Sequence, residues 1–279
     1  MSRISLAALA AFALFGALPA FADESPFGDI YTTDTLPKGG REVEQWLTYE
    51  HGRPFETFNH LAGRTEIEYG ITSRLQASLY LNYDWFENSP HSDKADTPHQ
   101  NFARFTGVSG EVIYRLVDPY THPIGVALYL EPLIGSDNRE VEFKVLLQKN
   151  FLDDRLVLAA NGVLEYEWTK DEEEWAHNTE VKALLGLSYR FAPNWFAGAE
   201  FMFKREFDGH VFDHAIAAAD SFFLGPTVHY THDKWWVTLS SQFQLPAAGN
   251  LNGEENQVVA GFAHEEPRLS LRLRFGYEF

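Results

Sequence analysis

The chain has 279 residues, no cysteine and a formal net charge of -18. This acidity makes nucleic acid an improbable partner, and the absence of cysteine excludes both disulfides and a lipid-modified N-terminal cysteine. Beyond residue 22 no run reaches the roughly 18 apolar residues that a membrane-spanning helix needs, so helical membrane proteins are also excluded.

The first 22 residues have the order of a secretory signal peptide. Arg3 supplies the positive charge, an apolar run extends from Leu6 to Leu18, and residues 20–22 (Ala-Phe-Ala) form a small-residue cleavage site. We therefore expect residues 1–22 to be removed on export, which leaves a formal charge of -19 because Arg3 is lost. Residues 23–40 are predicted to form a short periplasmic segment, followed by one domain over residues 41–279.

From residue 41 onward, apolar and polar residues alternate with a period of two, which indicates β-strands. In Leu75–Trp85, for example, the odd-numbered residues are apolar or aromatic and most even-numbered ones are polar. The pattern predicts twelve strands: Arg41–Glu50, Leu61–Tyr69, Leu75–Trp85, Val108–Leu116, Ile124–Leu130, Val141–Lys149, Leu156–Trp168, Trp175–Tyr189, Trp195–Arg205, Phe222–Tyr230, Trp235–Leu245 and Leu269–Phe279.

The predicted connections alternate in length. Links after even-numbered strands are short, as at Gly70–Arg74, whereas links after odd-numbered strands are longer, as at His51–His60 and Phe86–Gly107. An even strand number with this asymmetry is typical of bacterial outer-membrane barrels. The sequence therefore predicts an all-β fold, a transmembrane antiparallel up-and-down β-barrel of about 12 strands with short periplasmic turns and longer extracellular loops.

The last strand resembles the C-terminal assembly signal of outer-membrane barrels. Arg272 occupies its polar position, and Tyr277 and Phe279 form its aromatic pair, whereas Arg274 stands where glycine is usual. The resemblance implies that the barrel-assembly machinery recognises the chain through Phe279. The expected surroundings are outer-membrane lipid and lipopolysaccharide.

Charged residues of both signs, with acid in excess, occupy the inward-facing positions of these strands. We predict that the following residues line the lumen and set its selectivity: Glu42, Glu44, Glu66, Glu68, Glu111, Glu131, Glu142, Glu165, Arg115, Lys144, Lys182, Arg272 and Arg274. Barrel closure is expected to bring Arg268, Arg272 and Arg274 beside Glu42, Glu44 and Glu50, where opposite charges favour the closing register.

Two interpretations of this lumen stay open. A water-filled, mildly cation-preferring pore would pass small polar or weakly cationic solutes of unknown identity. Alternatively, ion pairs together with Trp46, Tyr80 and Trp236 fill the lumen, and a non-conducting barrel binds a ligand or partner through its extracellular loops.

Enzymatic chemistry has weaker support. Twelve-stranded outer-membrane phospholipases use a His and a Ser two residues apart on the outer wall, and the nearest counterpart here is His177 with Thr179. Because threonine replaces serine, we expect no enzyme. The histidine spacing predicts no catalytic metal, and no cofactor is expected.

Two predicted hairpins carry a family resemblance. Residues 68–75 (Glu-Tyr-Gly-Ile-Thr-Ser-Arg-Leu) and 114–119 (Tyr-Arg-Leu-Val-Asp-Pro) resemble the periplasmic hairpins of an uncharacterised group of proteobacterial outer-membrane β-barrels. That group is similar to outer-membrane channels named by analogy with a phenol-degradation pathway (MetA-like). The resemblance implies the fold and the location, but no substrate.

Overall fold

The computed structural model describes residues 25–90, 99–171, 174–209, 211, 216–251 and 257–279. Twelve long strands form its wall: β1 (Arg41–Arg53), β2 (Glu56–Thr72), β3 (Leu75–Pro90), β4 (Gln100–Val117), β5 (Gly125–Ile134), β6 (Asn138–Phe151), β7 (Leu156–Asp171), β8 (Glu174–Ala192), β9 (Trp195–Asp208), β10 (Ile216–His232), β11 (Trp235–Gln244) and β15 (Leu269–Glu278). Three two-residue strands, β12 (Gly249–Asn250), β13 (Val258–Val259) and β14 (Phe262–Ala263), lie between β11 and β15. Over the described ranges, no helix is long and apolar enough to cross a membrane.

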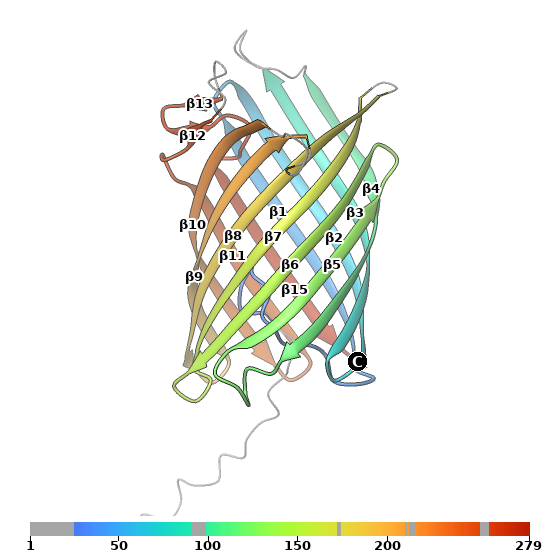
Figure 1. Cartoon of the computed structure of the whole chain (residues 1–279), viewed down its shortest axis with the longest axis vertical. Coiled ribbons are helices and arrows are strands. Elements are labelled where there is room, and N and C mark those ends of the chain that lie inside the picture. Colours follow the sequence, from blue (N-terminus) through green and yellow to red (C-terminus); the bar gives the residue numbers. More distant parts are fainter. Residues whose placement is uncertain (1–24, 91–98, 172–173, 210, 212–215, 252–256) are drawn as a thin grey trace, which may run out of the picture.

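Each long strand pairs antiparallel with its neighbour in the chain, and β15 pairs with both β11 and β1. The sheet therefore closes on itself as a barrel whose strands are tilted relative to the barrel axis (Figure 1). This confirms the predicted all-β, antiparallel 12-stranded fold. The predicted signal peptide, residues 1–22, lies outside the described residues.

Two predicted loops extend over residues that are strand. Within the predicted link Phe86–Gly107, β3 runs to Pro90 and β4 begins at Gln100. Residues 51–60 are mostly strand, since β1 runs to Arg53 and β2 begins at Glu56. The alternation weakens there because His51, Asn59 and neighbouring polar residues occur on both faces. Their side chains nevertheless pair across the two strands, and Tyr49 Oη donates to Asn59 Oδ1 at 2.7 Å.

The two faces of the wall differ as a period of two requires. Outward leucines such as Leu79, Leu185 and Leu239 are more than half exposed, whereas inward carboxylates such as Glu66 and Glu111 are buried. A wall with an apolar outside and a charged inside matches a barrel surrounded by hydrocarbon.

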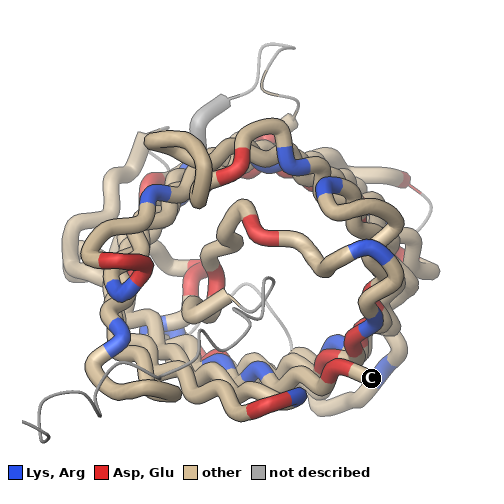
Figure 2. Tube along the Cα trace, turned by 90° about the horizontal axis from the view of Figure 1, so that it is seen from below, with Lys and Arg blue, Asp and Glu red and all other residues tan. Residues whose placement is uncertain are grey.

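The lumen contains part of the chain itself. Residues 25–40, which we call the N-terminal strap, enter the barrel at the end where the C-terminus lies, and they cross the lumen before β1 begins (Figures 1 and 2). Phe27, Ile30, Thr33 and Leu36 of the strap are at most 1% exposed. The segment predicted as a short periplasmic extension is thus an internal element from Ser25 to Leu36, whereas residues 37–39 are exposed.

Polar side chains from four strands hold the strap by its backbone. The N–H groups of Gly28 and Asp29 donate to the two carboxylate oxygens of Glu200 at 2.7 and 2.8 Å. Farther along, the backbone N–H groups of residues 31, 33 and 36 donate to Asn161, Gln148 and Gln76, respectively, at 2.7–2.8 Å. A segment without regular secondary structure needs such partners, because its buried backbone groups would otherwise be unpaired.

The strap also has an apolar contact with the wall. Phe27 and Ile30 pack against Val157, Ala159, Val163 and Leu184, which are inward-facing apolar residues of β7 and β8. Gly186 makes this contact possible, because a Cβ atom there would lie 2.7 Å from the Phe27 ring and 2.8 Å from Ile30 Cδ1. Burial of two such side chains contributes about 1.5–3 kcal/mol each.

Candidate functional site

A charged cavity of about 220 Å³, which we call the central cavity, lies between the strap and the wall. Five carboxylates and four basic groups line it: Asp29, Glu131, Glu140, Glu142, Glu165, Arg64, Lys144, Lys182 and Arg272. A second cavity, of about 280 Å³, also has Arg64, Glu131 and Glu140 in its lining, together with His60, Asp84 and Arg104. The ion pair between Arg64 of β2 and Glu131 of β5 therefore lies between the two cavities.

A third cavity, of about 500 Å³, lies on the other side of the strap. Pro26, Thr32 and Asp34 of the strap contribute to its lining, whereas Asp29 and Tyr31 face the central cavity. The strap thus separates the central cavity from the third cavity. A solute passing along the lumen would have to displace it.

Two rows of charge run across neighbouring strands beside the central cavity. We call the carboxylates Glu142, Glu165, Glu180 and Glu206 with the ammonium groups Lys144, Lys182 and Lys204 the charge belt. Residues directly opposite each other have the same sign, as in the pairs Glu165 with Glu180 and Lys182 with Lys204. The opposite charges meet diagonally across the strands, since Lys182 Nζ lies 2.8 Å from the Glu165 carboxylate and 2.7 Å from the Glu180 carboxylate.

The thirteen residues predicted to line the lumen occupy inward-facing positions, but they fall into separate groups. Six of them line the central cavity: Glu131, Glu142, Glu165, Lys144, Lys182 and Arg272. Glu42, Glu44, Glu66, Glu68 and Arg274 are buried in the wall on β1, β2 and β15. The two others contact the strap, since Glu111 accepts a hydrogen bond from Tyr31 and Arg115 lies 3.8 Å from Asp34.

The closing seam differs in part from its prediction. Arg274 Nη2 donates to Glu44 at 3.0 Å, as expected. Arg272, however, donates to Thr48 at 2.8 Å and forms an ion pair with Asp29 of the strap. Arg272 pairs with the strap because Asp29 lies beside the seam. The strand pattern alone does not predict this contact.

The three aromatic side chains predicted to fill the lumen are buried, and each donates a hydrogen bond to a carboxylate. Trp46 Nε1 donates to Glu44 and Trp236 Nε1 donates to Glu42, both at 2.6 Å, and Tyr80 donates to Glu111. They lie against the wall and support the carboxylates. Phe27 and Ile30 of the strap, which the sequence analysis did not identify, fill space further inside.

The hydrolase candidate has a different environment from the one it would need. Thr179 is fully buried, and its hydroxyl donates to the backbone carbonyl of Gly209 at 2.7 Å. The ring of His177 packs edge-on against Trp168. A nucleophile whose proton is held by a carbonyl is not activated by a base.

Asp34 makes the seating of the strap depend on pH. Burial raises the pKa of this carboxyl from 3.8 to about 6, although Gln148 donates to it at 3.0 Å and Arg115, Tyr120 and Thr32 also favour the ionised form. A carboxyl with a raised folded-state pKa destabilises the fold progressively as pH rises from about 4 to 6. Asp34→Asn is therefore expected to stabilise the barrel by up to about 3 kcal/mol at pH 7.5 and to have little effect at pH 4.

Urea denaturation of the refolded barrel in detergent at these two pH values measures that difference. Asp153→Asn, an exposed acidic residue in the β6–β7 turn, serves as the control. Equal effects of Asp34→Asn at both pH values would contradict the prediction.

Comparison with known proteins places the fold. No curated protein sequence matches the chain. The COG4313 outer membrane channel from Pseudomonas putida F1 is similar in structure, with a TM-score of 0.62 at 12% identity over 92% of this chain and 100% of that one. The NanC porin (TM-score 0.52, 12% identity, 85% and 100% covered) and the β domain of the Bordetella autotransporter BrkA (0.53, 13%, 87% and 100%) are also similar.

These likenesses establish that the chain has the fold of outer-membrane β-barrels. A family model gives the assignment by sequence, because it matches residues 19–279, which include the whole described wall and the strap. The chain belongs to the family of unknown function DUF6662.

Proposed function

We propose that this protein is an outer-membrane channel for small polar or weakly cationic solutes, closed at rest by its N-terminal strap. The observation that carries the proposal is the chain of three cavities inside one barrel, interrupted by the strap and by the Arg64–Glu131 ion pair. A barrel interior built only for stability has side chains that fill it. Five carboxylates against four basic groups in the central cavity favour cations weakly.

The surroundings follow from the same proposal. The apolar outer face would contact outer-membrane lipid and lipopolysaccharide, and the barrel-assembly machinery would recognise the exposed C-terminal Phe279. Two of the similar structures are described as a channel and a porin, which supports passage rather than catalysis. The barrel would perform no chemical reaction.

A non-conducting barrel is the second candidate, and the strap favours it. Phe27 and Ile30 fill the lumen beside β7 and β8, and backbone hydrogen bonds to four strands keep them there. In this case the loops at the end of the barrel opposite the C-terminus would bind a ligand or partner. The two candidates differ in whether the strap leaves its site.

Single-channel recording in planar bilayers separates them. We expect brief, cation-selective openings of the refolded wild type, when the strap leaves its site. The cation-to-anion permeability ratio should be about two- to fivefold lower in Glu140→Gln, because a unit charge about 4 Å from a passing ion contributes about 1 kcal/mol in water. Glu140 lines both the central and the second cavity. Asp153→Asn, outside these cavities, should leave the ratio unchanged.

Silence from a correctly folded wild-type barrel together with silence from variants that release the strap would refute the channel. Current that does not change in Glu140→Gln would place the conduction path elsewhere. Current only after strap release would show that the strap is the gate.

A further inference from the structure

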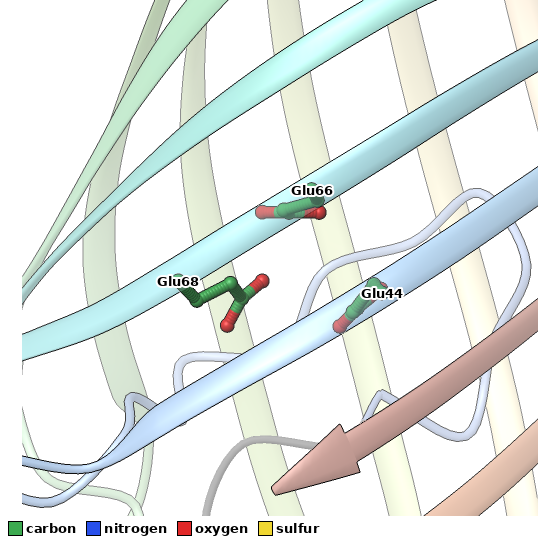
Figure 3. A group of neighbouring side chains, drawn as sticks. All are labelled: Glu44, Glu66 and Glu68. Atoms are coloured by element: carbon green, nitrogen blue, oxygen red, sulfur yellow. The ribbon is translucent and has the colours of Figure 1, made fainter. Parts of the chain in front are cut away.

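Three buried glutamates meet on the inner wall beside the closing seam. Glu44 lies on β1, and Glu66 and Glu68 lie on β2; we call these three side chains the acidic cluster (Figure 3). One carboxylate oxygen from each lies within 4.8 Å of the others, and the side chains are 4%, 0% and 5% exposed. Three like charges this close and this deeply buried repel one another strongly unless something neutralises them.

Part of the cluster has protein partners. Glu44 accepts hydrogen bonds from Arg274 at 3.0 Å and from the indole of Trp46 at 2.6 Å. Glu68 accepts one from the amide of Gln76 at 2.9 Å. Arg274 thus brings one guanidinium to the cluster, where it contacts Glu44.

Glu66 differs from its neighbours. Both of its carboxylate oxygens are buried, and neither has a hydrogen-bond partner among the described residues. Tyr80 lies directly opposite on β3, but its one hydroxyl proton goes to Glu111. A fully buried carboxylate with two unpaired oxygens, beside two other carboxylates, needs a neutralising partner, and a bound cation or a shared proton can supply it.

We infer that Glu44, Glu66 and Glu68 bind a hard divalent cation such as Ca²⁺. Carboxylate oxygens are the ligands that Ca²⁺ prefers, at 2.3–2.6 Å, and a central ion at that distance fits three oxygens separated by at most 4.8 Å. Three carboxylates with one guanidinium leave two negative charges, which a divalent ion balances. The sequence spacing predicted no metal because the three ligands come from two strands and include no histidine.

The cation site is connected to both ends of the strap. Arg274, which contacts Glu44, also donates to the carbonyl of Phe27 at 3.2 Å. Gln76, which contacts Glu68, accepts the backbone N–H of Leu36 at 2.7 Å. A bound cation would therefore fix two of the side chains that hold the strap, so that removal of the cation should loosen the strap as well. The inference does not depend on whether the barrel conducts.

Terbium luminescence tests the site directly, since the Trp46 indole is hydrogen-bonded to one of the ligands and can sensitise a bound ion. Metal-depleted, refolded protein is titrated with Tb³⁺, followed by Ca²⁺ as competitor. We expect one sensitised ion per barrel, displaced by Ca²⁺, and an affinity lowered by more than about tenfold in Glu66→Gln and in Glu68→Gln. Glu165→Gln, a buried carboxylate of the charge belt, is the matched control and should bind as the wild type does.

A second measurement does not rely on luminescence. Ca²⁺ should raise the urea midpoint of the wild type relative to chelator, and this increase should disappear in Glu66→Gln, whose neutral amide keeps the shape of the side chain. Absence of sensitised emission from folded wild-type protein would overturn the inference. So would equal binding by wild type and Glu66→Gln, and the carboxylates would then be sharing a proton instead.

Discussion

Release of the strap is expected when Glu200 is replaced by alanine. This side chain accepts two backbone N–H groups, from Gly28 and Asp29, and hydrogen bonds to a charged group contribute about 1.5–3 kcal/mol each. Loss of both should raise the population of released strap by more than about tenfold, because about 1.4 kcal/mol already changes an equilibrium tenfold. The wall should stay intact, because Glu200 faces the lumen.

A unique thiol can report the release. The chain has no cysteine, so Thr35→Cys introduces a single one on the strap, at a position that is 1% exposed. Its reaction with a charged thiol reagent should be slow in the wild-type background and more than about tenfold faster with Glu200→Ala, in proportion to the released population. Glu200→Gln keeps one acceptor oxygen and should have an intermediate rate.

Gly186→Leu provides an independent route to the same state. The new side chain would occupy the space of Phe27 and Ile30, so it should displace the strap while leaving every wall side chain that hydrogen-bonds to the strap unchanged. In planar bilayers both variants should conduct for longer than the wild type, since the third cavity would join the central one. Fast thiol labelling without more current than the wild type passes would show that the strap moves but does not control conduction.

The wall was predictable from sequence and the strap was not, for a physical reason. A strand facing hydrocarbon on one side and polar groups on the other must alternate, and this periodicity gave the twelve strands and the inward positions of the charges. The strap has no period. Its partners are single side chains on distant strands, such as Glu200, which lies 172 residues beyond Gly28.

Two signals in the sequence did point to an internal element. Val157, Ala159, Val163 and Leu184 are apolar at inward positions, where a water-filled lumen would favour polar residues. Side-chain amides also face inward beside the strap, at Gln76, Gln148 and Asn161. An amide can accept a hydrogen bond from one backbone group and donate a hydrogen bond to another. Inward apolar residues combined with inward amides therefore indicate a peptide segment inside a barrel.

The acidic cluster shows the same limit. Glu66 and Glu68 are two apart on one strand, as a polar lumen produces automatically, and only the register of β1 against β2 brings Glu44 directly opposite Glu66. A one-residue change of register would turn one of the strands over and remove the cluster. Strand patterns predict which residues face inward, whereas the partner that each of them meets depends on the pairing.

Loss of one ammonium group from the charge belt should destabilise the barrel strongly. Lys182 pairs with Glu165 and Glu180, and its side chain is 19% exposed beside carboxylates that are 12% and 15% exposed. Lys182→Met would leave Glu165 and Glu180 directly opposite each other with less compensation, and breaking a buried pair by removing one partner costs about 3–5 kcal/mol. The urea midpoint of the refolded barrel, followed by tryptophan fluorescence, should fall accordingly.

Two controls distinguish charge from packing. Lys182→Arg keeps the charge and should have a much smaller effect, while adding Glu165→Gln to Lys182→Met should recover part of the lost stability, because it removes one of the two repelling carboxylates. If Lys182→Met is as stable as the wild type, water in the central cavity must already screen the belt. That outcome would itself favour an open, hydrated lumen, since diagonal ion pairs at hydrated surfaces contribute little to stability.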